Sequence, residues 1–333
     1  MKITIIGAGA VGNLLAARLS ATPAQVSLLA RGEALEAVRR QGIMMVTPLR
    51  RVVYAQPHVT DDAHELGPQD VVFLCVKAHA LRSALDSLSL LTGPHTVVVP
   101  MINGIPWWYP YQQPAPLADQ PLNSVDPSEA LWRTINPAQV IGATTFVAVE
   151  NDGPGRIRHI SDQRFVFGAI SPDSPHTAAM VTEIVDLFGQ AGFQSRATDD
   201  IREAVWVKLW GNLGFNPLSA LTGATLGTLC LDPGTRSVGR AMMLEAKAVA
   251  EQLGITFGTS VDERIEMAAG VGDFKTSMLQ DFEAGRRLET AAIIGAVIEL
   301  AERLGMAVPT LRTILALLEM RVRSRDHALQ SAA

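Results

Sequence analysis

Cysteine is scarce in this sequence, where only Cys75 and Cys230 occur among 333 residues. Both lie in hydrophobic stretches far apart in the chain, which is typical of buried thiols in a reducing compartment and not of a disulfide framework. The seven histidines are scattered, without an HExxH or CxxC spacing, so we expect no metal site.

Basic clusters and long apolar runs are also missing. With a net charge of −5 and no block of lysine and arginine, the sequence indicates neither nucleic acid nor a membrane surface as a partner. No stretch approaches the ~20 apolar residues that span a bilayer. The apolar N-terminus resembles a signal peptide. However, three glycines interrupt it at the GxGxxG spacing, which is typical of a nucleotide-binding turn. We therefore expect a globular, cytoplasmic protein.

Strands and helices alternate through the first part of the chain. Apolar, β-branched stretches at 2–7, 25–31, 70–77 and 95–103 predict buried strands, and helical periodicity lies between them. This alternation predicts an α/β fold with a Rossmann-type, doubly wound parallel sheet. Farther along, antiparallel strands are expected on either side of the Gly-Pro-Gly turn at 153–155. A helix is then expected at about 176–191.

The pattern becomes almost wholly helical from residue 200 onward. We therefore expect two domains, a Rossmann-type domain at 1–199 and an all-helical substrate domain at 200–333. The helices expected in the second domain lie at about 201–215, 235–253, 260–270, 274–304 and beyond Pro309.

Residues 104–137 interrupt the Rossmann pattern with seven prolines and five of the eight Trp and Tyr residues. A loop of this length in a compact domain is usually functional or an insertion. Trp107, Trp108 or Tyr109 could add an apolar wall to a substrate pocket as part of a lid. Alternatively, these side chains pack on the other domain or on a second subunit.

The first strand runs directly into a glycine-rich turn and a helix. Its residues are Gly7, Ala8, Gly9, Ala10, Val11 and Gly12, in the pattern GxGxxG. The glycines permit a tight turn, a close approach of the backbone to a pyrophosphate and close packing of the helix, which suits a dinucleotide. A glycine-rich turn without a ligand is the alternative.

The end of the second predicted strand carries Arg31, where an acidic residue would bind the ribose 2′-hydroxyl of NAD. A guanidinium suits the 2′-phosphate of NADP instead. The sequence therefore favours NADPH/NADP as the cofactor. A solvated charge at a strand end is the alternative, and nearby Glu33 leaves NAD open.

Three polar residues are spaced four apart in the otherwise apolar stretch VWVKLWGNLGFNPL, at 205–218. Lys208, Asn212 and Asn216 therefore lie on one face of a predicted helix. Burying an ammonium and two amides costs several kcal/mol unless each finds a partner. The stripe indicates a ligand or a charged partner at this face.

Five motifs together resemble the ketopantoate reductase (2-dehydropantoate 2-reductase) family over nearly the whole chain. They are ITIIGAGAVG, LCVKAHA, INGI, VWVKLWGNLGFNPLSALT and SMLQDFEAGRRLE. The resemblance implies a two-domain, NADPH-dependent enzyme that reduces a small-molecule 2-keto acid. It further implies reduction of ketopantoate to (R)-pantoate in pantothenate biosynthesis.

The resemblance also assigns roles to residues of the second domain. Lys208 matches the general acid that polarises the keto oxygen and donates a proton, as hydride addition to a ketone requires. Glu289 matches a glutamate that bonds the substrate hydroxyl and orients the lysine. Asn212 and Asn216 match substrate-binding asparagines, and Ser277 matches a serine that holds the substrate carboxylate.

Two residues at the ends of predicted strands complete the set. By the same resemblance, Lys77 and Asn103 contact the nicotinamide ribose and the substrate. Both follow strands of the parallel sheet, whose carboxyl edge binds ligands in this fold. A solvated strand end for Lys77 and an Asn-Gly turn at Asn103 are the alternatives.

Residues of the second domain have structural alternatives too. Lys208 could extend to water beside a surface acid. Glu289 could pair with Arg286. Ser277 and Gln280 could form a capping box at a helix start.

Phe274 departs from the family pattern, because a substrate-binding asparagine is often found three residues before the matching serine. A reductase of another branched or aromatic 2-keto acid, giving a D-2-hydroxy acid, is therefore an alternative function. A non-enzymatic NADP-binding sensor predicts loss of Lys208 and Glu289, and an opine-type dehydrogenase should lack the Lys-Asn-Asn stripe. Either a monomer or a homodimer fits the apolar C-terminal helices.

Overall fold

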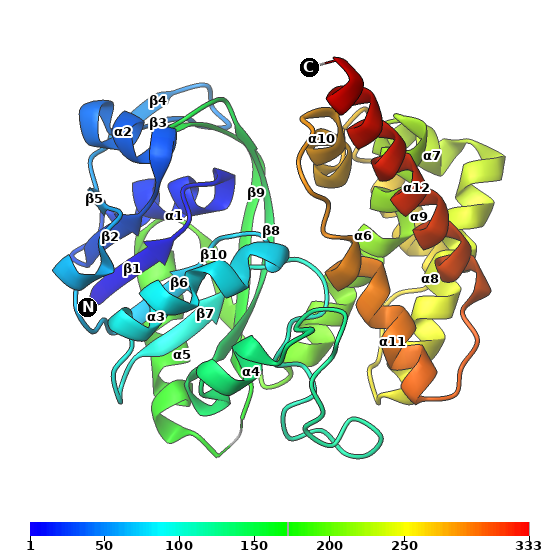
Figure 1. Cartoon of the computed structure of the whole chain (residues 1–333), viewed down its shortest axis with the longest axis horizontal. Helices are drawn as coiled ribbons and strands as arrows, with labels where there is room; N and C mark the ends of the chain where they lie inside the picture. Colours follow the sequence, from blue (N-terminus) through cyan, green and yellow to red (C-terminus); the bar gives the residue numbers. More distant parts are fainter. Residues whose placement is uncertain (172, 333) are drawn as a thin grey trace. The chain divides into compact units, whose positions relative to one another are not determined.

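The computed structural model describes residues 1–171 and 173–332 of the chain (Figure 1). The chain divides into two compact units, Met1–Ile102 with Ser128–Ala204, and Asn103–Pro127 with the chain from Val205 onward. This division differs from the predicted domains in one main respect. Residues 103–127, which include most of the proline- and aromatic-rich insertion at 104–137, belong to the helical unit and not to the Rossmann-type unit.

A five-stranded parallel sheet forms the centre of the first unit. Its order is β5-β2-β1-β6-β7, which is the predicted doubly wound arrangement. The strands are β1 (Lys2–Ile6), β2 (Gln25–Leu29), β5 (His58–Thr60), β6 (Val71–Leu74) and β7 (Val97–Pro100). The helices of this part are α1 (Ala10–Leu19), α2 (Gly32–Gln41), α3 (Leu85–Leu91), α4 (Ala130–Thr134) and the 3₁₀ turns η1 (Ala63–Glu65), η2 (Ala78–Ala84) and η3 (Pro137–Gln139). β6 and β7 are continuously buried because the sheet is covered on both faces.

A second sheet completes this unit, in the order β10-β9-β3-β4 with β8 paired antiparallel to β9. Its strands are β3 (Ile43–Val46), β4 (Val52–Ala55), β8 (Ile141–Asn151), β9 (Arg156–Ala169) and β10 (Gln194–Ala197). The helix α5 (Pro175–Gln190) packs on β9 and β10. Phe165, Phe167 and Phe188 pack together in this core, with ring centroids 4.8–6.2 Å apart and the Phe188 ring edge-on to the other two.

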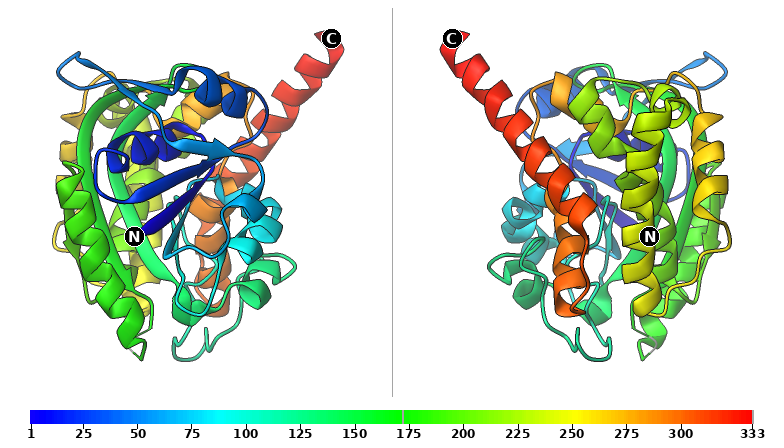
Figure 2. Two further views of the ribbon diagram at one scale, coloured as in Figure 1. Left: turned by 90° about the vertical axis from the view of Figure 1, so that its left-hand side faces the viewer. Right: turned by 90° about the vertical axis from the view of Figure 1, so that its right-hand side faces the viewer.

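The second unit is helical, as predicted. Its elements are α6 (Ile201–Thr222), α7 (Leu226–Leu231), α8 (Pro233–Gln252), α9 (Val261–Ala269), α10 (Ser277–Glu283), the π-helical turn η4 (Ala291–Gly295), α11 (Ala296–Arg303) and α12 (Pro309–Ala332). Figure 2 shows α12 as one long helix at the end of the chain. The prediction of a single helix over 274–304 is wrong, because Gly285, with φ of +68°, ends α10 in the left-handed conformation.

The insertion packs into the second unit through its aromatic residues. Trp107, Trp108 and Tyr109 are each no more than 1% exposed. The Tyr109 hydroxyl accepts a hydrogen bond of 2.7 Å from the indole N–H of Trp206 on α6. At the other end of the insertion, the Glu299 carboxylate of α11 accepts two backbone N–H bonds, from Asn123 at 2.9 Å and Ser124 at 2.8 Å. These contacts favour packing on the helical domain over an apolar lid.

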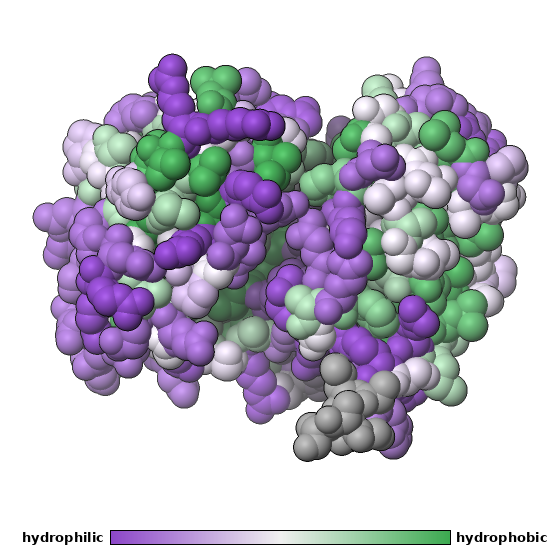
Figure 3. All heavy atoms as spheres, turned by 90° about the horizontal axis from the view of Figure 1, so that it is seen from above, coloured by the Kyte–Doolittle hydropathy of each residue, from purple (hydrophilic) through white to green (hydrophobic). Residues whose placement is uncertain are grey.

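The surface shown in Figure 3 is mostly hydrophilic, with hydrophobic side chains gathered in smaller patches. Among the described residues, no helix is both long and apolar enough to cross a membrane. The two cysteines are unpaired thiols, as the sequence indicated.

Candidate active site

The glycine-rich turn between β1 and α1 has a backbone geometry that a side chain would disturb at two of its positions. Gly7 has φ of +108°, and a Cβ there would come within 2.8 Å of Cγ1 of Val76. A Cβ on Gly12 would lie 1.9 Å from the Gly7 carbonyl oxygen, so only glycine lets α1 start this close to the turn. A Cβ on Gly9, by contrast, would meet no atom within 4 Å. Gly9 therefore borders open space, where a phosphate can approach the backbone.

The start of α1 adds hydrogen-bond donors to this open space. Gly9 is its N-cap and offers no side chain to the first N–H groups of the helix, which are therefore available to an anion. Asn13, which the sequence analysis missed, donates from its side-chain amide to the Ala8 carbonyl at 2.8 Å and is fully buried. This hydrogen bond connects the first turn of α1 to the glycine-rich turn. In the sequence, Asn13 could have been singled out as the one amide among the apolar residues of this predicted helix.

Arg31 and Lys77 lie at the carboxyl edge of the same sheet. Arg31 directly precedes α2 and is exposed. Among the described residues, its side chain makes one long contact, of 3.5 Å with the Ser87 hydroxyl. Its guanidinium is therefore available to a phosphate. Lys77 is half-buried at the start of η2, after β6. The structure thus places the turn, Arg31 and Lys77 on one edge of one sheet.

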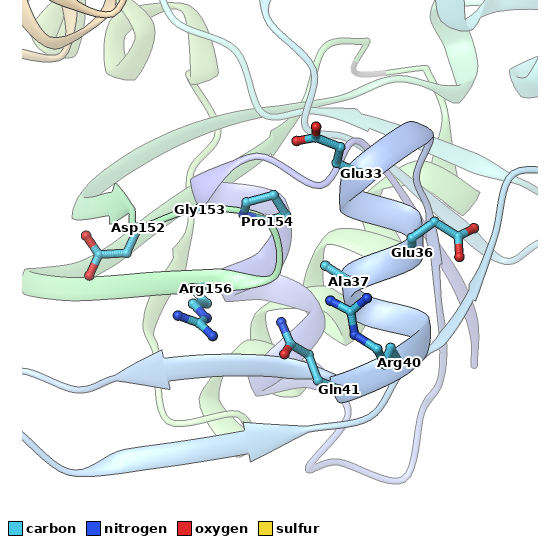
Figure 4. A pocket seen from close by; sticks show the side chains of 9 residues that line it. All are labelled: Glu33, Glu36, Ala37, Arg40, Gln41, Asp152, Gly153, Pro154 and Arg156. Carbon is cyan, nitrogen blue, oxygen red and sulfur yellow. The ribbon is translucent and has the colours of Figure 1, made fainter.

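A hollow of about 400 Å³ lies elsewhere in the first unit, between α2 and the β8–β9 turn (Figure 4). Its lining carries both signs of charge, from Arg40 and Arg156 on one hand and Glu33, Glu36 and Asp152 on the other. None of the predicted site residues lines it. Because both signs of charge line this hollow, it does not favour binding of either an anion or a cation.

The polar stripe on α6 is present as predicted. Lys208 is half-buried, and the loss of water around its ammonium lowers its pKa from the ordinary 10.5 to about 8. The negative charge of Glu289 acts against this and raises the pKa. Asn216 is 8% exposed and Asn212 is half-buried. Within the described part of the chain neither amide has a hydrogen-bond partner, so both are available to a ligand.

Glu289 and Asn103 come together in the second unit, 186 residues apart in sequence. The Asn103 side-chain amide donates to the Glu289 carboxylate at 3.1 Å, and Glu289 is only 7% exposed. The alternative partner for Glu289 is wrong, because Arg286 pairs with Asp281 at 2.8 Å. The buried Glu289 carboxylate thus acts electrostatically on Lys208 of α6 and accepts a hydrogen bond from the Asn103 side-chain amide.

Ser277 stands at the first position inside α10 and not at its N-cap. The cap is Thr276, whose hydroxyl accepts from the Leu279 N–H at 3.2 Å. The capping-box alternative is therefore wrong, because Ser277 is not the cap and the Gln280 side chain donates to the Lys275 carbonyl instead. The Ser277 hydroxyl is exposed and has no partner among the residues that the structure describes.

The main chain at Phe274 is fixed by two hydrogen bonds. Its carbonyl accepts from the Leu226 N–H at 2.9 Å, and its N–H donates to the Gly272 carbonyl at 2.8 Å. The half-buried phenyl group therefore extends from an ordered segment just before α10. It supplies apolar surface and no hydrogen bond at this position.

Sequence profiles of two related families cover most of the chain. The family described as ketopantoate reductase PanE/ApbA matches residues 3–172, and its C-terminal counterpart matches residues 200–322. A curated 2-dehydropantoate 2-reductase from Mesorhizobium japonicum is 47% identical over 318 residues, which are 95% of this chain and 96% of that protein.

Solved structures share the whole fold. A candidate ketopantoate reductase from Ralstonia solanacearum MolK2 superposes with a TM-score of 0.88 at 36% identity, over 97% of this chain and 98% of that one. A D-mandelate dehydrogenase solved with NADH and anilino(oxo)acetate has a TM-score of 0.84 over 98% and 99% of the two chains, but its 19% identity shows the fold alone. From the profile matches and the 47% identity over nearly its full length, this chain belongs to the ketopantoate reductase family.

Proposed function

We propose that this protein is an NADP-dependent oxidoreductase that reduces 2-dehydropantoate (ketopantoate) to (R)-pantoate. One observation of the structure carries the proposal. A half-buried lysine, Lys208, has a pKa lowered to about 8 and lies within the electrostatic influence of Glu289, on a helix face with two available amides. A proton donor works best when its pKa is close to the working pH, and Lys208 meets that condition.

Lys208 performs the acid step in this proposal. Its ammonium donates a hydrogen bond to the keto oxygen and then the proton, so that an alkoxide does not accumulate. Glu289 keeps the ammonium charged by opposing the effect of burial. The same carboxylate accepts a hydrogen bond from the hydroxyl group of the substrate.

Three polar side chains of the second unit would orient the keto acid. Asn212 and Asn216 have amides without partners in the described chain, and each can donate to a substrate oxygen. The exposed Ser277 hydroxyl is free to donate to the carboxylate. Such groups lower the barrier by fixing the reacting carbonyl relative to the proton donor.

The first unit would hold the cofactor. The open space at Gly9 and the uncapped start of α1 suit a pyrophosphate, and the exposed Arg31 guanidinium suits a 2′-phosphate. NADPH, when bound, supplies the hydride. Lys77 and Asn103 are further residues that we assign to cofactor or substrate binding, and their contacts with these ligands stay predictions.

A reductase of a bulkier 2-keto acid is the second candidate. The observation that favours it is Phe274, whose ordered phenyl group adds apolar surface where related enzymes often have an asparagine. Losing a polar contact to the substrate normally costs a large factor in specificity.

The test compares substrates and cofactors directly. Initial rates of NADPH and NADH oxidation are measured with 2-dehydropantoate and with aliphatic and aromatic 2-keto acids. We expect the highest kcat/KM for 2-dehydropantoate with NADPH. A higher value for an aromatic 2-keto acid would establish the second candidate, and no turnover of any keto acid would favour the NADP-binding sensor. A cytoplasmic location and the choice between monomer and homodimer stay predictions.

A further inference from the structure

The helix that follows Glu289 begins with a π turn. At Ala291–Gly295 the N–H of Ala296 bonds to the carbonyl of Ala291, five residues back, and not to that of Ala292. The Ala292 carbonyl accepts a hydrogen bond of 2.8 Å from the N–H of Ile105 in the insertion. The π turn thus turns a backbone acceptor towards another segment, a use that fits the frequent occurrence of such turns at functional sites.

Gly104 is the residue that permits this approach. It has φ of +84°, which L side chains rarely adopt. A Cβ at this position would lie 2.3 Å from the Ala292 carbonyl oxygen and 2.4 Å from its carbon. A side chain here would therefore both strain the backbone and push the insertion away from the helix.

The residue before Gly104 makes the contact that matters for chemistry. The Asn103 amide reaches the Glu289 carboxylate at 3.1 Å, while the Ile293 N–H bonds to the Glu289 carbonyl at 3.1 Å. A glutamate side chain has three rotatable bonds, and a fixed donor reduces the positions that its carboxylate can take. Residues 103–105 therefore hold the Glu289 carboxylate and the start of the helix that follows Glu289 at two adjacent points.

We propose that Gly104 and the π turn are positioning elements, which hold the Asn103 amide on the Glu289 carboxylate and so keep its charge near Lys208. Neither Gly104 nor the Ala292 carbonyl has to touch a substrate for this role. The kinetic consequence rests on the proposed reductase function, whereas the electrostatic consequence does not.

The test is the substitution Gly104→Ala, read out on the lysine itself. The titration of Lys208 is followed by pH-dependent acylation and mass spectrometry of the peptide that contains it. Because the Glu289 charge raises the pKa of Lys208, its displacement should lower that pKa below the wild-type value of about 8. Gly254→Ala is the matched control, since Gly254 has φ of +83° but no atom within 4 Å of its Cβ position.

Two further variants separate positioning from a general loss of structure. Asn103→Ala removes the donor without crowding the helix, so it should lower the same pKa even where Gly104→Ala fails to fold. Glu289→Gln should lower it as well, and adding Gly104→Ala to Glu289→Gln should cause no further change. In kinetics we expect kcat/KM to fall about 10- to 100-fold in Gly104→Ala, with its decline starting at a lower pH.

The outcomes distinguish this inference from the proposed function. A Lys208 titration unchanged in both Gly104→Ala and Asn103→Ala would overturn the positioning role, whatever the activity. A lowered titration in these variants, together with a wild-type protein that does not reduce 2-dehydropantoate, would support the positioning role and contradict the proposed substrate. If Gly254→Ala lowered the pKa of Lys208 by the same amount, the effect of Gly104→Ala would be explained by backbone strain alone, and the inference would be overturned.

Discussion

Replacing Lys208 by methionine should abolish proton donation and yet stabilise the fold. Burial lowers the pKa of Lys208 from 10.5 to about 8, so the folded protein binds this proton more weakly than the unfolded chain. Below pH 8 the lysine is charged in both the folded and the unfolded state. The difference between its two pKa values then lowers the free energy of unfolding by up to about 3 kcal/mol. Lys208→Met keeps the apolar stem and removes the charge. At pH 7 we therefore expect its free energy of unfolding to rise by up to about 3 kcal/mol.

The pH dependence gives the sign of the effect. Between about pH 8 and 10.5 the folded wild type releases the proton while the unfolded chain still binds it, so the stability of the wild type rises with pH. The advantage of Lys208→Met should therefore shrink over this range and vanish above it. Lys247→Met, which removes a surface lysine paired with Glu251, should change stability by only about 0.5 kcal/mol or less at any pH.

Urea unfolding followed by tryptophan fluorescence is the assay. Four of the five tryptophans belong to the second unit, Trp107, Trp108, Trp206 and Trp210, so this signal reports mainly on the unit that contains Lys208. Measurements at pH 7 and pH 9.5 compare wild type, Lys208→Met and Lys247→Met. A loss of stability in Lys208→Met at pH 7, or an advantage that does not shrink at pH 9.5, would refute the reasoning.

Three more predictions concern separate parts of the molecule. Arg31→Ala should raise the KM for NADPH about tenfold or more while leaving the KM for NADH nearly unchanged, and initial-rate kinetics with both cofactors would check this. Tyr109→Phe should leave the buried Trp206 indole N–H without its acceptor and cost about 1–3 kcal/mol, measured by urea unfolding, whereas an unchanged midpoint would contradict the role of this bond. Gly12→Ala should weaken NADPH binding in fluorescence titration, because its Cβ would lie 1.9 Å from the Gly7 carbonyl oxygen; an unchanged Kd would argue against the close packing of this turn.

The sequence predicted the fold well where local patterns are strong. The strand around 2–7 is a short β-branched run and the strand around 70–77 is continuously apolar, and the structure places both at the centre of a parallel sheet. The helix break at Gly285 was missed because apolar periodicity continues across it, and only its left-handed conformation shows where α10 ends. The assignment of residues 103–127 to the first domain failed for another reason. Their place depends on contacts of Tyr109 and Asn123 with residues far along the chain.

The residue types of the candidate site were predictable from the sequence, but the contacts that hold these residues in place were less so. The four-residue spacing identified Lys208 and its asparagines, because buried polar groups at helical spacing need partners. The contact between Asn103 and Glu289 spans 186 residues, and it was not derivable from local patterns. The same holds for the π turn, which has no sequence signature of its own. Thr276 was missed as an N-cap because Ser277 beside it fits the same motif.

The central claim is that Lys208 is the proton donor in the reduction of 2-dehydropantoate. The direct test is kcat/KM for 2-dehydropantoate with NADPH, measured as a function of pH for wild type and Lys208→Met. We predict a wild-type value that declines above about pH 8, as Lys208 loses its proton, and a loss of about 10²- to 10⁴-fold in Lys208→Met. A Lys208→Met protein that is folded and retains the wild-type kcat/KM across this pH range would contradict the account.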